Sequence, residues 1–471
     1  MNEKKVKRGE TVELKISALA FEGGGIGEID GLKVFVEGTF PGDTVLAYVF
    51  KSKKNFAQAR LIEILKPSEN RIVPRCEYVG TCRGCQMQEL PYDKQVDIKK
   101  SHIEDCLYRI GGFKDAKVSE IIPCKDNFFY RNKMEFSFGY DADKNFTLGM
   151  HAPNRKFDIL DLKRCYLESE YSIAILALVR KFAKEHGFIP FNFGNGEGDF
   201  RSLYIREGKR TGEVMVNIVV DGNVSQATID DISLLSSQLA NLKSVADGEE
   251  DKKIVSIYMT KVISKKGVPR SDRPYLLFGK PAISEKMIID EQTLNFDIYP
   301  SSFFQVNTFQ AEELYRIVRD FAVEKSQGVV FDLFCGTGTI GLFLSKHVNQ
   351  VIGVELVEDA VKAARENALK NGIFNADFYL GDVFKKLSEI RERPSLVVVD
   401  PPRAGLSEKS IIKLNEFSPS QIIYVSCNPA TLARDLKLFS EFGYQIKKIK
   451  AVDMFPHTYH IETVVLIEKD F

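Results

Sequence analysis

The last third of the chain repeats one pattern, a short apolar run followed by a helical stretch, and this repetition limits the fold more than any other feature. The apolar runs carry no polar face. Such strands are expected in a parallel sheet that helices cover on both sides. We therefore predict a doubly wound α/β domain at residues 294–471. Its strands are expected at residues 329–334, 351–354, 378–380 and 396–399.

A glycine-rich turn follows the first of these strands. Residues Gly336 to Gly341 read G-x-G-x-x-G, which is weak evidence alone because the motif serves dinucleotides and other adenosine ligands alike. Glu355 ends the second strand, where its carboxylate can accept hydrogen bonds from a ribose diol. Asp382 follows the third strand, near the expected adenine, and Asp332 is expected to cap the turn. The pattern predicts an adenosine-containing ligand.

The fourth strand ends in Asp400-Pro401-Pro402-Arg403. A carboxylate and two prolines form a rigid lip above the carboxyl edge of the sheet, where α/β proteins bind their ligands. This lip argues against a nicotinamide enzyme. Enzymes that methylate exocyclic amines have Asn-Pro-Pro and an aromatic residue at the same place, so Asp and Arg here disfavour amino-group methylation.

Cys427 lies between the apolar run 421–424 and a helical pattern that opens at Pro429. Proline suits a first helical position because its missing N–H would be unpaired there anyway. The partial positive charge of a helix N-terminus favours a thiolate over a thiol. Cys427 is therefore a candidate nucleophile. The alternative is a buried cysteine that acts only as a small hydrophobic residue.

A thiol and a carboxylate beside a methyl donor suit alkylation of an unreactive pyrimidine carbon. C5 of uracil becomes nucleophilic once a thiolate adds to C6, and a base must later remove the C5 proton so that the thiol can leave. Cys427 and Glu462 fit these two roles, with Asp400 ionised beside the pyrimidine or hydrogen-bonded to its edge. For Glu462 the alternative is an exposed carboxylate at a strand edge.

The bulk composition limits the remaining possibilities. A chain of 471 residues is too long for one core, so two or three domains are expected. Its 65 Lys and Arg balance 65 Asp and Glu, so composition gives no argument for nucleic acid or membrane. No apolar run approaches a membrane span and the start has no apolar signal segment, which predicts a cytoplasmic protein. Eight cysteines are too sparse for a disulfide scaffold.

Short alternating runs and glycine-rich turns dominate residues 1–66. Strands packed this densely predict a small closed barrel of the oligonucleotide-binding sort. Several cations surround Phe56, which suits a stacked base and a phosphate backbone, although a solvated hairpin face is as good an explanation. These cations are Lys51, Lys53, Lys54 and Arg60.

Three cysteines form the pattern C-x5-C-x2-C in a polar, glycine-containing loop, at Cys76, Cys82 and Cys85. Three thiols this close indicate a soft metal or an iron–sulfur cluster. A four-thiolate site needs one more ligand, for which the candidates are Cys165, Cys106 and Cys124. The spacing is not that of radical enzymes. Structural zinc and incidental cysteines remain as alternatives.

The middle of the chain, residues 67–293, is predicted to mix helices and strands around the cysteine loop. Helical periodicity extends from Tyr92 to Ile110 and again from Ser172 to His186. Arg131 and Lys133 would share one face of a strand, where they could contact phosphate. A strand edge made soluble by charge explains them equally well.

Taken together, these motifs resemble the RNA uracil-5-methyltransferase family over essentially the full length. The motifs that carry the resemblance are Phe303-Phe304-Gln305-Val306-Asn307, Asp332 to Gly338, Asp400 to Arg403, Ser426 to Pro429, and Met454 to Glu462. The resemblance implies a Rossmann-like methyltransferase domain that binds S-adenosylmethionine through Gln305, Phe334, Glu355 and Asp400, with Asp382 near the adenine. It also implies that Cys427 is the nucleophile and Glu462 the base.

The N-terminal stretch is similar to the TRAM domain, an RNA-binding barrel, in Gly25-Ile26-Gly27 and Phe40-Pro41-Gly42-Asp43. A TRAM barrel together with C-x5-C-x2-C resembles the branch of the family that acts on 23S ribosomal RNA. That branch holds a [4Fe–4S] cluster on four cysteines, and Cys165 matches the distant fourth. The resemblance implies three parts: a barrel at 1–66, a cluster-bearing α+β domain at 67–293 and a methyltransferase domain at 294–471.

The expected partner is RNA, bound by a monomer without DNA or membrane. A neutral chain is compatible with RNA because folded RNA is recognised by shape and by stacking of splayed-out bases, and the target uridine must be flipped into the site. Three alternatives remain: the same reaction on the T-loop uridine of tRNA, a non-catalytic RNA-binding assembly factor, and a structural zinc protein with an ordinary methylase domain.

Overall fold

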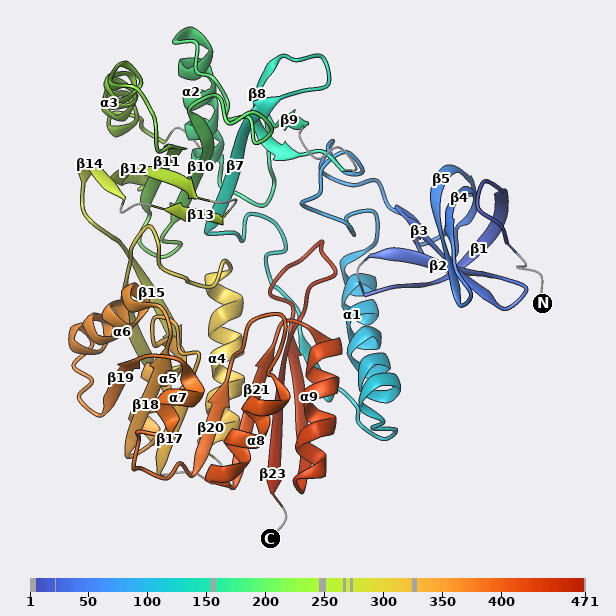
Figure 1. Ribbon diagram of the computed structural model, residues 1–471, viewed down its shortest axis with the longest axis vertical. Helices are drawn as coiled ribbons and strands as arrows, with labels where there is room; N and C mark the ends of the chain where they lie inside the picture. The colour runs from blue at the N-terminus through green and yellow to red at the C-terminus, as the bar shows by residue number, and fades with distance from the viewer. Residues whose placement is uncertain are drawn as a thin grey trace.

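A barrel, two eight-stranded sheets and a two-stranded hairpin make up the computed structural model, which describes residues 6–21, 23–153, 158–244, 251–265, 268–271, 274–323 and 328–469. The small barrel lies to one side, the sheet with two helices lies at one end, and the second large sheet, between helices, lies at the other (Figure 1). Among the described residues, no helix has both the length and the apolar composition needed to cross a bilayer.

The N-terminal strands close into the barrel that the sequence predicts, in the order β1-β2-β3-β5-β4. Alternate side chains point inward, so that Val34, Val36, Val45 and Ala47 are fully buried in its core. The strands are β1 (Thr11–Leu19), β2 (Gly24–Ile29), β3 (Leu32–Glu37), β4 (Thr44–Ser52) and β5 (Phe56–Lys66).

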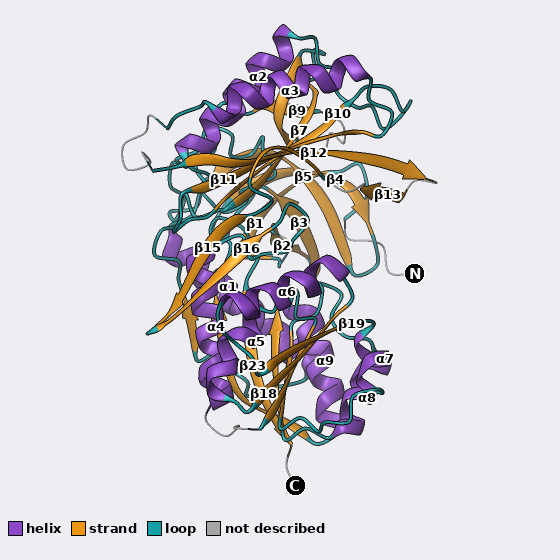
Figure 2. Cartoon of the chain, turned by 90° about the vertical axis from the view of Figure 1, so that its left-hand side faces the viewer, coloured by secondary structure: helices purple, strands orange, loops and turns teal. Residues whose placement is uncertain are grey.

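The middle sheet has the order β13-β12-β11-β10-β7-β8-β9, with β14 paired to β12. Helices α2 (Glu170–Glu185) and α3 (Gln226–Ala240) cover one face, begun by the N-caps Ser169 and Ser225 (Figure 2). The other face carries no helix of the described residues and is turned toward the C-terminal sheet (Figure 1). The strands are β7 (Lys133–Tyr140), β8 (Phe146–His151), β9 (Ile159–Asp161), β10 (Phe200–Glu207), β11 (Glu213–Asp221), β12 (Lys253–Lys265), β13 (Val268–Ser271) and β14 (Tyr275–Gly279).

The C-terminal sheet is doubly wound, as predicted, with the order β19-β18-β17-β20-β21-β23-β22-β6. The first five of these strands are parallel, whereas β23 is antiparallel to both neighbours. The strands are β17 (Val329–Leu333), β18 (Gln350–Glu355), β19 (Ala376–Leu380), β20 (Leu396–Val399), β21 (Gln421–Ser426), β22 (Tyr444–Val452), β23 (Glu462–Lys469) and β6 (Glu120–Ile122).

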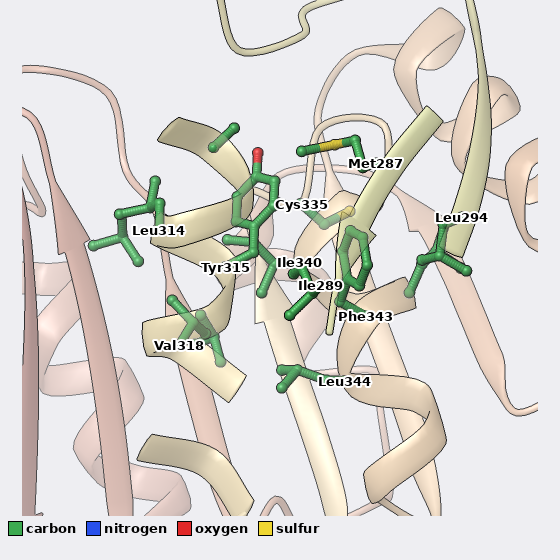
Figure 3. Packing of buried hydrophobic residues seen from close by; sticks show 14 of the residues in the cluster. Met287, Ile289, Leu294, Leu314, Tyr315, Val318, Cys335, Ile340, Phe343 and Leu344 are labelled. Atoms are coloured by element: carbon green, nitrogen blue, oxygen red, sulfur yellow. The ribbon is translucent and has the colours of Figure 1, made fainter. Parts of the chain in front are cut away.

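Each face of this sheet has its own apolar core. On one face, α4 (Thr308–Val323) and α5 (Thr339–Leu344) pack with the hairpin of β15 (Ile283–Ile289) and β16 (Gln292–Ile298). Figure 3 shows Tyr315, Ile289, Ile340 and Phe343 gathered there. The remaining helices are α6 (Glu358–Lys370), α7 (Val383–Leu387), α8 (Glu408–Phe417), α9 (Pro429–Glu441) and the short η2 (Ser345–His347).

One early segment belongs to the C-terminal core, although it lies within the range 67–293 that was assigned to the middle domain. Helix α1 (Tyr92–Cys106), its π-helical end η1 (Leu107–Gly111) and strand β6 pack beside α9 and β22. The reason is apolar burial, since Ile103 and Leu107 are fully buried in the same cluster as Leu432 and Ala433. The predicted helix is therefore present but packs on the other sheet.

Candidate active site and cysteine cavity

The predicted site residues of the last domain gather at the carboxyl ends of its parallel strands. The glycine-rich turn after β17 has left-handed backbone at Phe334, Gly336 and Gly338, with φ of 64°, 54° and 78°. Glycine adopts such angles at little cost, whereas for Phe334 the conformation is strained. Asp332 accepts a hydrogen bond at Oδ2 from Gly341 N at 2.9 Å, as expected for a cap of the turn. The turn is held open toward the end of the sheet.

Glu355 is fixed at the end of β18 by backbone donors. Its Oε2 accepts from Gly336 N at 3.1 Å, and its Oε1 accepts from Leu356 N at 2.8 Å and Val357 N at 3.0 Å. Each carboxylate oxygen has further acceptor capacity that a hydroxyl group could use. Asp382 is exposed and caps α7 by accepting from Lys385 N at 3.0 Å. Contact of Asp382 with an adenine stays a prediction.

Gln305 lies in the loop before α4, and Asn132, the residue just before β7, holds this loop. Gln305 is 8% exposed, and its carbonyl accepts from Asn132 Nδ2 at 2.8 Å. Asn132 N also donates to Val306 O at 2.8 Å. Sequence reasoning missed Asn132, because an asparagine between two cations gives no signal of a partner 173 residues away.

Cys427 and the Asp400–Arg403 lip are joined through the start of α9. Asn428 caps this helix by accepting from Ala430 N at 3.0 Å, and its Nδ2 donates to Arg403 O at 3.3 Å. Thr431 Oγ1 donates to the same carbonyl at 3.3 Å. The structure thus brings the thiol, the lip and the helix N-terminus together, as the sequence predicts.

The ionisation of Cys427 differs from the prediction. Burial raises the pKa of its thiol to about 11, and Glu462 and Asp400 add to the rise while Arg403 opposes it. The expectation that Cys427 is a thiolate because it lies at a helix N-terminus is therefore wrong for the folded protein, since the net effect of its surroundings is a raised thiol pKa. Desolvation and two neighbouring acids outweigh a partial positive charge of about half a unit.

The carboxyl groups beside this thiol are also protonated more readily than usual. Glu462 begins β23 and is 5% exposed, so it is not the exposed strand-edge carboxylate of the alternative reading. Burial, and then Asp400, raise its pKa well above the usual value. Burial raises the pKa of Asp400 to about 7, with Asp332 adding to the rise. These acids would all release protons more easily beside a positive charge.

A buried polar network supports the loop that leads to Glu462. Lys99 of α1 forms an ion pair of 2.6 Å with Asp453, both side chains being fully buried, and Tyr92 donates to the same carboxylate at 2.8 Å. His457 has left-handed backbone, with φ of 67°, and its N donates to Gln95 Oε1 at 3.0 Å. Sequence reasoning named His457 within the Met454–Glu462 motif and Tyr92 as a helix start, but it did not predict this network.

The four cysteines predicted as metal ligands line a single cavity, which Tyr78, Met134 and Tyr166 also border. These are Cys76, Cys82, Cys85 and Cys165. Cys106 and Cys124, the other candidates, do not line the cavity. Among the described residues, no three His, Cys, Asp or Glu lie close enough to hold one metal ion. The structure therefore assembles the thiols without forming a single-ion site.

Hydrogen-bond donors point at the sulfur atoms around this cavity. Gly84 N donates to Cys82 Sγ at 3.3 Å. Cys76 accepts from the backbone of Tyr78, and Cys165 from that of Leu167. Burial raises the pKa of the Cys85 and Cys165 thiols to about 12. Donors of this kind stabilise thiolates, so the cavity suits a positively charged group bound by sulfur.

The cysteine loop also reaches the loop that precedes Glu462. His457 O accepts hydrogen bonds from Gln86 N at 2.8 Å and Met87 N at 2.9 Å, immediately after Cys85. The barrel meets the same region, because the Phe21 ring lies 5.7 Å from that of Tyr459 and His102 Nε2 lies 2.7 Å from Leu19 O. All three parts of the chain therefore contact the segment 453–461.

Two regions of the chain match known sequence families. Residues 248–470 match the family described as tRNA (Uracil-5-)-methyltransferase, and residues 5–62 match the TRAM domain. An uncharacterized RNA methyltransferase of Caldanaerobacter subterraneus is 38% identical over 462 residues, which cover 98% of this chain and 99% of that protein. The chain belongs to the RNA uracil-5-methyltransferase family.

Other members of the family are similar along the whole chain. An uncharacterized RNA methyltransferase of Clostridium tetani is 38% identical over 473 residues, 98% of each protein. The crystal structure of Pyrococcus abyssi tRNA (uracil-54, C5)-methyltransferase in complex with S-adenosyl-L-homocysteine is 30% identical. It superimposes with a TM-score of 0.72 over 97% of this chain and 100% of that one. This uracil-5-methyltransferase is accordingly an enzyme that depends on S-adenosylmethionine and modifies RNA.

The residues at the sheet edge fit this cofactor. Cys427, Asp400 and Glu462 suit a cationic ligand, because a positive charge favours the ionised forms of nearby acids. The turn at Phe334 and the fixed carboxylate of Glu355 suit an adenosine. The acidic groups thus suit the positive charge of a sulfonium, and the turn and Glu355 suit a nucleoside.

Proposed function

We propose that this enzyme methylates C5 of a specific uridine in 23S ribosomal RNA, with Cys427 as nucleophile and Glu462 as base. The observation that carries the reaction is the convergence of the Cys427 thiol with the Glu462 and Asp400 carboxyl groups at one sheet edge. Covalent catalysis at a pyrimidine needs one sulfur nucleophile and one proton acceptor. The burial of Glu462 provides an acceptor protected from water.

In the proposed reaction Cys427 first loses its S–H proton to solvent. The thiolate sulfur then adds to C6 of the uracil, forming an S–C6 bond and moving the C5–C6 π electrons into an enolate. When S-adenosylmethionine is bound, it supplies the methyl group that C5 takes. The demethylated cofactor then leaves as S-adenosylhomocysteine. Glu462 then removes the C5 proton, and the electrons of that C–H bond restore the C5–C6 double bond as the S–C6 bond breaks. The proton ends on Glu462, whose raised pKa favours holding it.

Five residues are proposed to hold the cofactor. The strained turn at Phe334 and the fixed Glu355 support an adenosine site, and Asp400 offers a negative charge to a sulfonium. Gln305 is placed by its bond to Asn132. Asp382 follows β19 at the same edge, which supports contact with the adenine.

We also propose a [4Fe–4S] cluster on Cys76, Cys82, Cys85 and Cys165, whose shared cavity supports it. Four thiolates that bind one zinc ion each lie about 2.3 Å from the same metal atom. In a four-iron cluster each thiolate binds a different iron atom, so the thiolates are further apart. The resemblance to the 23S ribosomal branch favours the cluster over structural zinc in the cavity that the four cysteines share. The bonds from Gln86 and Met87 to His457 suggest its role, which is to fix the loop before Glu462.

Protein purified without air is expected to be coloured and to contain about four iron atoms per chain. Cys85→Ser removes one thiolate and should lower the iron content and bleach the colour, whereas Cys106→Ser, outside the cavity, should change neither. Metal and sulfide analysis of the three proteins checks this. Stoichiometric zinc without sulfide would contradict the cluster.

The choice of RNA rests on the barrel and the four-cysteine cavity, a combination that resembles the 23S ribosomal branch. A second candidate is the same reaction on tRNA, favoured by the likeness to the Pyrococcus abyssi enzyme, whose name gives a tRNA uracil as its target. That likeness covers 97% of the chain.

Methyl transfer from labelled S-adenosylmethionine to unmodified 23S ribosomal RNA and, in parallel, to unmodified tRNA tests the choice. We expect label in the ribosomal RNA, recovered as 5-methyluridine at a mapped position. Label in tRNA alone would keep the reaction and overturn the substrate. The matched control is Cys427→Ala, which should label neither RNA.

A further inference from the structure

Two cations lie directly opposite each other on the helix-free face of the middle sheet. Lys133 of β7 pairs in register with Arg206 of β10, and their neighbours Met134 and Ile205 point into the core on the helix-covered side. Strand β7 lies between β10 and β8, but β8 pairs only with residues 137–140, so Lys133 has a strand neighbour on the β10 side alone. Like charges directly opposite on adjacent strands destabilise a sheet. This arrangement therefore calls for a function.

Among the described residues, no carboxylate forms an ion pair with either cation of this pair. Arg206 is 5% exposed, and within the described part of the chain neither Arg206 nor Lys133 forms a salt bridge. Burial lowers the pKa of Arg206 to about 10, and burial and then Arg206 lower that of Lys133 to about 8. Glu135 opposes the shift of Lys133, and the Lys133 ammonium lies 5.2 Å from the Tyr204 ring centre. Buried charges without partners are costly unless they serve a ligand.

Two buried hydrogen-bonding atoms at this place have no partner. Arg206 Nη2 donates to Ser302 O at 2.9 Å, but Arg206 Nη1 and Ser302 Oγ make no hydrogen bond in the described structure. Arg131, two residues before Lys133, likewise has a buried Nε without a partner, while its Nη1 lies 3.3 Å from Met134 Sδ. Buried donors are nearly always satisfied in native proteins, so an anionic acceptor fits here.

The pair is connected to the nucleophile by further cations. The positive charge of Arg131 contributes to the lowered pKa of both Lys133 and His460. His460 Nε2 lies 3.3 Å from Arg403 Nη2, and Arg403 in turn lowers the pKa of Cys427. The helix-free face is turned toward the sheet edge that carries Cys427 (Figure 1). Arg131 and Arg403, with the uncharged His460 between them, thus extend the cationic groups from the middle sheet toward the thiol.

We propose that Lys133 and Arg206, assisted by Arg131, bind a phosphodiester of the RNA strand beside the flipped-out target uridine. The inference rests on the proposed function only in taking RNA as the substrate. Phosphate contacts position a strand without reading its sequence, and a flipped nucleotide needs its flanking backbone held. An anion at this point satisfies Arg206 Nη1 and Ser302 Oγ and removes the repulsion between the two cations. The carboxylate of the cofactor's amino-acid part has the same anionic chemistry, and the experiment separates the two.

The test measures RNA affinity at several salt concentrations for Lys133→Gln and Arg206→Met, using unmodified 23S ribosomal RNA and tRNA transcripts. Each variant should bind RNA about tenfold more weakly or worse, because a charge-assisted contact is lost. The slope of log affinity against log salt should fall by about 0.7–0.9 for each charge removed. Affinity for S-adenosylhomocysteine should not change. The melting temperature should stay equal or rise, since the repulsion is relieved; a purely structural pair would give a lower one.

The matched control is Lys181→Gln, which removes one charge from α2 on the opposite face of the same sheet, where the side chain is 73% exposed. It should leave both the affinity and the slope unchanged. If Arg206→Met fails to fold, Lys133→Gln decides alone, and Arg206→Lys should retain the wild-type slope.

An unchanged salt slope in a folded Lys133→Gln protein overturns the phosphate site. Weakened S-adenosylhomocysteine binding with an unchanged slope also overturns it and assigns the anion to the cofactor. The proposed function fails in a different way: a wild-type enzyme that binds RNA with the expected slope but forms no 5-methyluridine disproves the reaction, whereas loss of slope in the variants still supports the phosphate site.

Discussion

Cys427→Ala is expected to abolish methyl transfer while leaving cofactor binding intact. Without the sulfur, C6 of uracil cannot be saturated and C5 stays too weak a nucleophile to take the methyl group. Loss of a nucleophile costs an enzyme at least about 10⁴-fold in turnover. Methyl incorporation into RNA gives the rate, and calorimetric titration with S-adenosylhomocysteine gives the affinity, which should stay within about twofold because no proposed cofactor contact is removed.

Cys106→Ala is the matched control, because this thiol lies at the end of α1, away from the site. It should retain full activity. A Cys427→Ala enzyme within tenfold of the wild-type rate would disprove the covalent mechanism, since no other cysteine is placed among Asp400, Arg403 and Glu462 in the described structure.

The parts of the fold that local patterns encode could be predicted from the sequence. The continuous apolar run 329–334 indicates a strand buried on both faces. The alternation of apolar and polar residues in 32–36 indicates a barrel strand with one face exposed to solvent. Asp332 could be assigned to the glycine turn because its partner, Gly341, is only nine residues away. Cys427 and Glu462 could be named because their residue types suit the chemistry.

Contacts between distant segments could not be predicted. Lys99 meets Asp453 across 354 residues, and Arg206 meets Lys133 only because β10 pairs with β7. A lysine in a polar helical pattern looks like a solvent-exposed residue, yet Lys99 is fully buried. The helix at 92–110 could be expected to pack on a different domain from the cysteine loop before it, but the range 67–293 still grouped α1 and β6 with the middle domain, whereas their apolar residues complete the C-terminal core.

The charge of Cys427 was mispredicted for a related reason. A helix N-terminus is visible in a sequence, and it stabilises a thiolate by a modest amount. Burial and the neighbours Glu462 and Asp400 come from the tertiary structure, and together they raise the pKa instead. Residue types therefore predicted which groups meet, whereas the folded environment determined which of them carry protons.

Glu462→Gln is expected to stop turnover and to trap the RNA on the enzyme. The Cys427 sulfur can still add to C6 and C5 can still be methylated, but an amide cannot accept the C5 proton, so the S–C6 bond does not break. The substitution should cost little stability. Burial and Asp400 raise the pKa of Glu462, which means that its charge is costly at this position, and glutamine has nearly the same shape without that charge.

Denaturing electrophoresis with labelled RNA checks this prediction, because a thioether adduct survives denaturation and a non-covalent complex does not. The adduct should reach a stoichiometric amount only when S-adenosylmethionine is present. It should be absent from the Cys427→Ala/Glu462→Gln double variant. Loss of turnover without an adduct would show that another group removes the C5 proton. Asp400, whose pKa of about 7 leaves it partly ionised at neutral pH, would then be the next candidate base, and Asp400→Asn would be the variant to test.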